Sequence, residues 1–141
     1  IQLTLAQKIP VAGAVVVTTP QDVATLDARK ALKMFEKVAI PVLGLVENMA
    51  VHVCGACGHA EHLFGEGGAA RMSAQYGVPV LGSLPLEIGI REQGDAGAPI
   101  VAARPGSAAA QAYRDTARAL LSELGKRPKL RGGIMASLLG G

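Results

Sequence analysis

The sequence predicts an α/β fold in which helices flank a mostly parallel sheet. Short runs of β-branched and aliphatic residues alternate with longer amphipathic segments, the pattern of strand–helix repeats. Half of the 141 residues are hydrophobic but only 3% are aromatic, a composition that suits closely packed α/β layers. The strand-like runs contain no alternating polar residues. We therefore expect them to be buried on both faces, as in a parallel sheet.

The first part of the chain predicts a helix, a strand and a longer helix. Residues 1–9 are amphipathic and favour a helix, and the run GAVVV at 13–17 predicts a buried strand. Thr19 is a suitable N-cap and Pro20 suits a first helical turn, so a helix of about 17 residues should follow. We expect its inward face to consist of Val23, Leu26, Met34, Phe35 and Val38.

The middle of the chain predicts a second buried strand, a cysteine-containing segment and a short helix. The run VLGLV at 42–46 is the strand. The segment 50–68 then interrupts the alternation of strands and helices, and its glycines make a flexible joint. Residues 69–76 predict a helix that Gly77 ends.

The last part of the chain predicts a third strand, a loop and a final helix. The strand covers 78–82, and a loop rich in Gly, Ala and Pro covers roughly 88–106. Ser107 caps an amphipathic helix that extends to about Leu124. Its expected inward residues include Ala112, Ala119, Leu120 and Leu124. Residues 125–141 are expected to form a flexible basic tail.

Three predicted strands end in segments that point to a ligand site. These segments are Thr18-Thr19-Pro20, Glu47-Asn48-Met49 and Leu84-Pro85-Leu86, and ligands of open parallel sheets bind beyond the carboxyl ends of the strands. No G-x-x-x-x-G-K-[ST] motif occurs, and no G-x-G-x-x-G follows a strand. The stretch FGEGGAA at 64–70 follows the cysteine segment rather than a strand, so we do not expect a phosphate cradle there. These residues alone should not hold a triphosphate.

Charge and hydropathy exclude some classes of partner. The net charge is +3, with the excess near the C-terminus and no interleaved aromatic residues, so we expect no nucleic-acid binding. No apolar run reaches the ~18 residues of a membrane helix, and we expect no membrane partner. Two cysteines do not make a disulfide framework, which favours the cytoplasm. The chain opens with Ile1 rather than methionine, and we expect it to be a piece of a longer protein.

The stretch VCGACGH at 53–59 carries both cysteines, Cys54 and Cys57. Two thiolates are an incomplete ligand set, and several interpretations are open. The cysteines could be buried apolar residues, or a redox dithiol, which usually begins a helix. A zinc site could recruit histidines from the same segment, namely His52, His59 or His62. A [4Fe-4S] cluster requires four thiolates, which two copies of the chain could supply about a two-fold axis.

The motifs occur together in a known order. The stretches VVVTTPQDVATLDARKALKMF, PVLGLVENMA, CGACGHAEHLFGEGGA and GVPVLGSLPLEIGIREQGDAGAPIV follow one another along the chain. This arrangement resembles the C-terminal half of the Mrp/ApbC family, iron–sulfur cluster carrier P-loop ATPases related to MinD. The resemblance extends from Ile1 to about Leu124. It implies that residues 1–124 are the C-terminal portion of a MinD-like (SIMIBI-type) P-loop NTPase domain.

The resemblance implies a function and a set of site residues. Cys54 and Cys57 would bind a labile [4Fe-4S] cluster shared by a homodimer, which delivers it to apo iron–sulfur proteins. Asn48 would contact the adenine of ATP, with Pro85 and Leu86 beside it. The family's phosphate loop and the motif that supports magnesium are absent from these residues, so whether this chain is an enzyme is left open. The alternative is a zinc-stabilised, MinD-like regulatory ATPase or scaffold.

Overall fold

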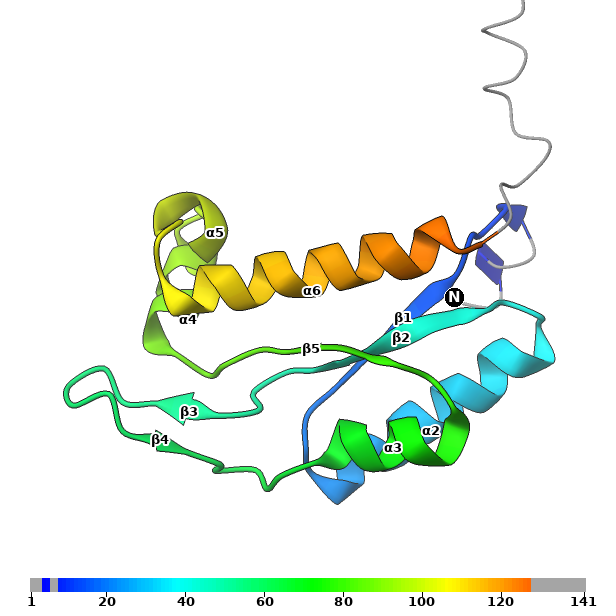
Figure 1. Ribbon diagram of the computed structural model, residues 1–141, viewed down its shortest axis with the longest axis horizontal. Helices are drawn as coiled ribbons and strands as arrows, with labels where there is room; N and C mark the ends of the chain where they lie inside the picture. Colours follow the sequence, from blue (N-terminus) through cyan, green and yellow to red (C-terminus); the bar gives the residue numbers. More distant parts are fainter. Residues whose placement is uncertain (1–3, 6–7, 128–141) are drawn as a thin grey trace, which may run out of the picture.

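The protein is a layered α/β structure, seen in a computed structural model that describes residues 4–5 and 8–127. A parallel sheet of three strands lies between two helix layers (Figure 1). Helix α6 covers one face, and helices α2 and α3 cover the other. Part of the predicted helix at 1–9 lies outside the described residues. Most of the predicted tail at 125–141 also lies outside them.

The sheet consists of β1 (Ala14–Thr18), β2 (Val42–Glu47) and β5 (Val80–Ser83), in the order β1-β2-β5. All neighbours are parallel, as the continuous apolar runs predicted. The register places Thr18 opposite Glu47, and Glu47 opposite Ser83. The carboxyl ends of the three strands therefore meet at one edge of the sheet.

Helix α2 (Asp22–Lys37) differs from its prediction at its start and on its buried face. Its N-cap is Gln21, whose side chain makes no capping hydrogen bond. The hydroxyl of Thr19, the predicted cap, donates to the side-chain oxygen of Gln21 and accepts from no helix N–H. Val23 is 73% exposed and Leu26 is 52% exposed, so the inward placement of these two residues was wrong. The residues buried on this helix are Thr25, Ala28 and Leu32. Their spacing places them on one helix face. The large apolar residues of the sequence do not indicate this face, because Thr25 is polar and Ala28 is small.

Helix α3 (Gly68–Tyr76) is confirmed, with Gly77 as its C-cap in the left-handed conformation. Glycine is required at two positions at the start of this helix, for a different physical reason at each. Gly67 has φ of 71°, which disfavours other residues. A Cβ on Gly68 would lie 2.7 Å from the carbonyl oxygen of Pro20, so glycine here permits a close approach of α3 to the segment between β1 and α2.

The predicted loop at 88–106 was wrong. It contains α4 (Ile88–Asp95) and the short α5 (Ile100–Ala103). Helix α6 (Ala108–Gly125) is confirmed, and the Ser107 hydroxyl accepts a hydrogen bond from the Ala110 amide at 3.1 Å. The predicted inward residues Ala112, Ala119 and Leu120 pack against the core, whereas Leu124 at the helix end is 38% exposed.

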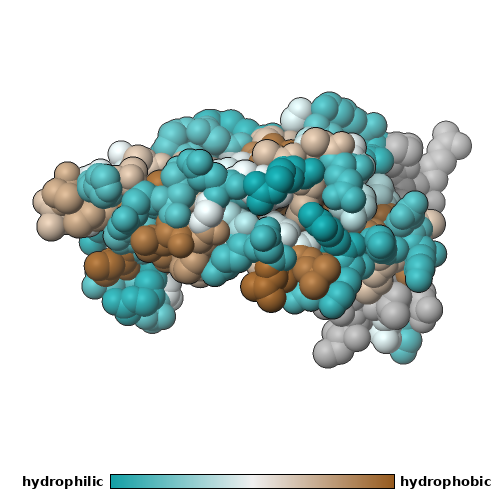
Figure 2. All heavy atoms as spheres, turned by 90° about the horizontal axis from the view of Figure 1, so that it is seen from below, coloured by the Kyte–Doolittle hydropathy of each residue, from teal (hydrophilic) through white to brown (hydrophobic). Residues whose placement is uncertain are grey.

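The core has two parts, one on each face of the sheet. The part between the sheet and helices α2 and α3 consists of Val16, Ala28, Leu32, Leu45, Ala69 and Met72. Under α6 lie Val46, Leu81 and Leu84. Viewed from below, hydrophobic side chains at the surface lie in separate groups among hydrophilic ones (Figure 2). None of the helices in the described part of the chain combines the length and apolar character that crossing a membrane requires.

A small antiparallel hairpin extends beyond the sheet and was not predicted (Figure 1). It consists of β3 (His52–Val53) and β4 (Ala60–Glu61), with two residues in each strand. Its position in the chain is between β2 and α3. The hairpin therefore begins at the same sheet edge where the three strands end.

Candidate functional site

The two cysteines lie in the turn of this hairpin. The Cys54 amide donates to the His59 carbonyl at 2.9 Å, and the Gly58 amide donates to the Cys54 carbonyl at 2.8 Å. Gly58 has φ of 72°, which the turn requires. Both thiols are free, with Cys54 half-buried and Cys57 exposed. The turn thus carries both thiols at the end of the hairpin, outside the core, so they are not buried core residues.

The turn also favours the thiolate of Cys54. The backbone N–H groups of Cys57 and Ala56 donate toward its sulfur and lower the pKa of this thiol. The thiolate is the form that binds metals. Cys54 is therefore prepared by the backbone to act as a ligand.

The structure does not complete a ligand set within one chain. Among the described residues, no group of three or more His, Cys, Asp or Glu side chains is placed to hold a metal ion. His62 makes contacts of 2.8 Å with the Ala50 carbonyl and the Glu66 carboxylate. His52 has its Nδ1 3.4 Å from the Glu61 carboxylate. The histidines of a Cys2His2 site are thus not gathered around the thiols, and the cysteines begin no helix, as a redox dithiol would.

The base of the hairpin is joined to the segment after β5. The Leu86 amide donates to the Val51 carbonyl at 2.7 Å, and the Val53 amide donates to the Leu86 carbonyl at 3.3 Å. His52 and Leu86 form a parallel bridge. The strand that leads into Cys54 is therefore paired with the segment predicted to border a nucleotide base.

The predicted base-binding residues lie together. Asn48, Pro85 and Leu86 line one cavity of about 230 Å³ at the carboxyl end of the sheet. The Asn48 side-chain oxygen accepts from the Met49 amide at 2.9 Å. Its Nδ2 group makes no hydrogen bond to the described residues and so has donors available to a ligand. The other lining residues are Met49, Glu87, Ile90, Arg91 and Tyr113.

Sequence reasoning missed several residues of this cavity. Ile90 and Arg91 come from α4, which was expected to be a loop, and Tyr113 comes from α6. The pair Ile90-Arg91 does not indicate a cavity wall in the sequence, because its position becomes clear only once α4 is known. Tyr113 is one of two tyrosines in the sequence. Its rarity could have marked it as a candidate site residue, but its position on α6 alone does not indicate a pocket.

Glu47 is a second residue whose role was missed. It is only 7% exposed, and its Oε2 accepts from the Ala69 amide at 2.8 Å, at the start of α3. A carboxylate at a helix N-terminus is favourable because it satisfies an otherwise unpaired N–H and complements the helix dipole. The Glu47 carboxylate therefore binds the start of α3, the position within FGEGGAA at which a phosphate could otherwise bind.

The comparisons with known proteins extend over most of the chain. A model of the ParA group described as NUBPL iron-transfer P-loop NTPase matches residues 1–121. The chain belongs to the NUBPL iron-transfer P-loop NTPase family. This confirms the resemblance inferred from the motifs, including the statement that the chain matches part of a longer protein type.

Two curated relatives of this family agree with that assignment. The iron-sulfur cluster carrier protein of Pseudomonas fragi is 66% identical over 117 residues, which cover 83% of this chain and 41% of the relative. The carrier protein of Escherichia coli K12 is 55% identical over 124 residues, covering 88% of this chain and 34% of the relative. The chain thus spans about a third to two fifths of the length of these relatives.

Solved structures confirm the fold of this NUBPL-family chain. The Pyrococcus furiosus cell division ATPase MinD has a TM-score of 0.63 at 25% identity, covering 79% of this chain and 43% of MinD. A nucleotide-binding protein of Archaeoglobus fulgidus in complex with ADP has a TM-score of 0.53 at 37% identity, covering 61% of this chain and 35% of that protein. The predicted MinD-like P-loop NTPase fold with a parallel sheet is confirmed.

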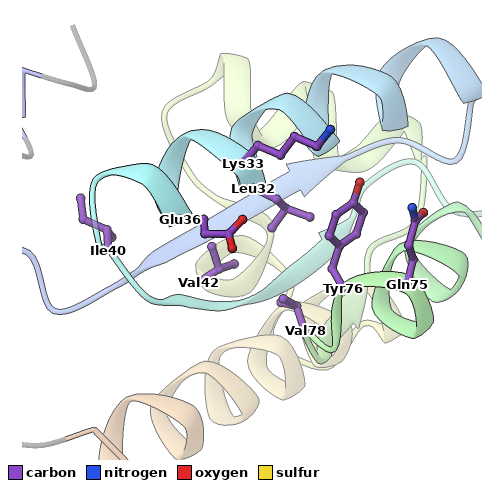
Figure 3. Close-up of a pocket in the computed structure, with 8 residues that line it drawn as sticks. All are labelled: Leu32, Lys33, Glu36, Ile40, Val42, Gln75, Tyr76 and Val78. Carbon is purple, nitrogen blue, oxygen red and sulfur yellow. The ribbon is translucent and has the colours of Figure 1, made fainter.

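A larger cavity lies at the other end of the sheet (Figure 3). Its volume is about 430 Å³, and it lies between the later turns of α2 and α3. Val42 begins β2 and Val78 precedes β5, so this cavity is at the amino ends of the strands. Ligands of this class of sheet bind at the carboxyl ends. We therefore assign the candidate site to the smaller cavity and the adjoining hairpin.

Proposed function

We propose that this chain is the cluster-binding portion of an iron–sulfur carrier. Cys54 and Cys57 bind one edge of a [4Fe-4S] cluster, and the same two residues of a second copy bind the other edge. The homodimer delivers this cluster to apo iron–sulfur proteins. The carrier names of the relatives support the class of function. We also assign the chain to the cytoplasm, where free thiols persist.

The incomplete ligand set carries this proposal. Two adjacent thiols at an exposed turn, with no third ligand gathered among the described residues, satisfy half of the four-thiolate requirement. A two-fold axis presents the same patch from both subunits, so a contact between two such turns supplies four thiolates. A cluster held between two exposed turns is also accessible to an acceptor protein, which suits transfer.

The cavity beside the hairpin suits the adenine of ATP. At about 230 Å³ it is smaller than the ~300–1,000 Å³ of sites that enclose a whole drug-sized ligand, so it suits one ring system of a larger molecule. The Asn48 amide supplies hydrogen-bond donors, while Pro85 and Leu86 supply an apolar wall. The phosphates and magnesium would be held by residues outside this sequence, which contains no phosphate-loop motif. ATP-dependent loading or release belongs to the longer parent protein.

Anaerobic reconstitution of the full chain with ferrous iron and sulfide tests the cluster proposal. We expect a brown protein with about two iron atoms per chain, corresponding to one [4Fe-4S] cluster per dimer. Light scattering should show a dimer only in the loaded sample. Cys54→Ala and Cys57→Ala should each lose the colour and the dimer. Ala56→Ser, which changes the turn without removing a thiol, should retain both.

Two results would overturn this function. A monomer that holds a complete four-iron cluster would remove the need for a partner's thiols. A colourless chain that retains one zinc ion per protomer in elemental analysis would favour the alternative, a zinc-stabilised MinD-like regulatory ATPase or scaffold.

A further inference from the structure

The cysteine hairpin is too small to hold its own position. Each of its strands has two residues, and the only cross-strand pairs are His52 with Glu61 and Val53 with Ala60. Isolated two-stranded hairpins are at best marginally stable in water. The residues of the cysteine turn are largely exposed and add little packing. The direction in which the thiols point must therefore be fixed by contacts at the base of the hairpin.

The two sides of that base are fixed differently. The incoming strand β3 is paired with the backbone of Leu86. The outgoing strand β4 has β3 as its one strand neighbour among the described residues. His62 follows β4 directly, and its Nδ1 lies 2.8 Å from the carbonyl oxygen of Ala50. Ala50 is buried and precedes β3, so this contact closes the base of the hairpin.

The second ring nitrogen of His62 has a partner as well. Its Nε2 lies 2.8 Å from Oε1 of Glu66. A carbonyl oxygen and a carboxylate oxygen both accept hydrogen bonds, and each ring nitrogen of His62 faces one of these oxygens. The Glu66 carboxylate is a charged acceptor, and hydrogen bonds with a charged partner are stronger than neutral ones. The backbone carbonyl of Glu66 accepts from Nη1 of Arg71 at 2.7 Å, which joins this loop to α3.

We propose that His62 is a positioning residue for the Cys54–Cys57 pair. By joining Ala50 to Glu66, its ring fixes the outgoing side of the hairpin and with it the direction of the thiols. His62 touches neither thiol, so its effect on the cluster is exerted through the hairpin. The link to the cluster rests on the proposed function, whereas the fixing of the hairpin can be measured in the metal-free chain.

Hydrogen exchange in the metal-free, reduced full chain measures that fixing directly. The amides of Cys54 and Gly58 make the hydrogen bonds of the turn. In His62→Phe, which removes both ring contacts, we expect these two amides to exchange roughly five- to tenfold faster. In His62→Asn, whose amide can still donate to Ala50, most of the protection should return. Amides of α6 should exchange as in the wild type in both variants.

His59 provides the matched control. It lies in the same turn with an exposed side chain, and its backbone carbonyl, which accepts from the Cys54 amide, is retained in any substitution. His59→Phe should leave the exchange of Cys54 and Gly58 unchanged. Unchanged exchange in His62→Phe, or an equal increase in His59→Phe, would overturn the positioning role.

The cluster provides a second measurement. In reconstituted protein, the rate of iron loss to a chelator should rise several-fold in His62→Phe, rise less in His62→Asn and be unchanged in His59→Phe. If the wild type binds no cluster, the proposed function fails, and the exchange data still decide whether His62 fixes the hairpin. If the wild type binds a cluster and His62→Phe changes neither rate, the positioning role alone is wrong.

Discussion

The carboxyl end of the sheet and the cysteine hairpin meet at Leu86, but they are stabilised in opposite ways. Strand β2 is buried along nearly its whole length, with core on both faces. The hairpin has two-residue strands and an exposed turn held by a few hydrogen bonds. The difference separates two tasks. Substitutions in the sheet should change the free energy of unfolding, whereas substitutions in the hairpin should change ligand binding and leave stability nearly intact.

The largest expected effect is in the centre of the sheet. Leu45 is 0% exposed, so Leu45→Ala removes packing and leaves a cavity. We expect the free energy of unfolding to fall by about 2–5 kcal/mol, measured by urea denaturation. Leu63→Ala, at an exposed leucine between β4 and α3, is the control and should change it by less than about 0.5 kcal/mol. If both variants lost the same free energy of unfolding, stability would not be concentrated in the sheet as the comparison states.

A smaller effect is expected at the carboxyl end of β2, where Glu47 contacts the start of α3. Glu47→Ala removes the acceptor of the Ala69 amide at the buried start of α3. We expect a loss of about 1–3 kcal/mol in urea denaturation, with faster exchange of the Ala69 amide. Glu47→Gln retains an oxygen acceptor and should lose less. If Glu47→Gln were as destabilised as Glu47→Ala, the charge rather than the hydrogen bond would be what stabilises α3.

The hairpin should show the converse behaviour. Cys57 is exposed, so Cys57→Ala should change the free energy of unfolding of the metal-free chain by no more than about 0.5 kcal/mol. The same variant should lose its iron completely on reconstitution. A large loss of stability without metal would mean that the thiol is a structural residue and would weaken the comparison.

The thiolate of Cys54 gives a pH-dependent test. Because backbone N–H groups of Cys57 and Ala56 lower the pKa of Cys54, its reactive form persists to lower pH in the folded chain than in the unfolded chain. Alkylation of Cys54 in Cys57→Ala, which keeps both N–H groups, should therefore reach half of its maximum rate at a lower pH when folded than in urea. Identical profiles would show that the turn does not favour the thiolate.

The smallest signal is expected for ATP. The cavity at Asn48 offers contacts to a base, but helix N-termini and lysines of a phosphate loop supply much of the affinity for a triphosphate. Isothermal titration of this chain should give a dissociation constant of roughly millimolar or weaker. Micromolar affinity would require a phosphate site within these residues.

Much of the sheet and one side of the site could be predicted from the sequence. Runs such as 42–46 contain no polar residue, and their short length and β-branched residues favour a strand buried on both faces. The strand-end rule pointed to three segments. The family resemblance selected Asn48, Pro85 and Leu86 from two of them, and the structure places all three around one cavity. Ser107 was identified as a cap because its hydroxyl satisfies a helix amide, a local interaction that sequence shows directly.

The parts that escaped prediction depend on tertiary contacts. Helix α4 contains Gly89 and Gly94, which lower helix propensity, and its contacts with α5 compensate. Strands β3 and β4 are too short to have a periodic signal, because their pairing depends on Leu86 from a later part of the chain. The capping of α3 by Glu47 joins residues 22 positions apart, and no local pattern records such a contact.

The double role of Leu86 has a mechanical consequence. The residue borders the cavity, and its backbone is hydrogen-bonded on both sides to the stretch leading into Cys54. An occupant that shifts Leu86 must either carry β3 with it or break two hydrogen bonds. Any displacement of Leu86 at the wall of the cavity would therefore be transmitted through these hydrogen bonds to the strand that carries Cys54.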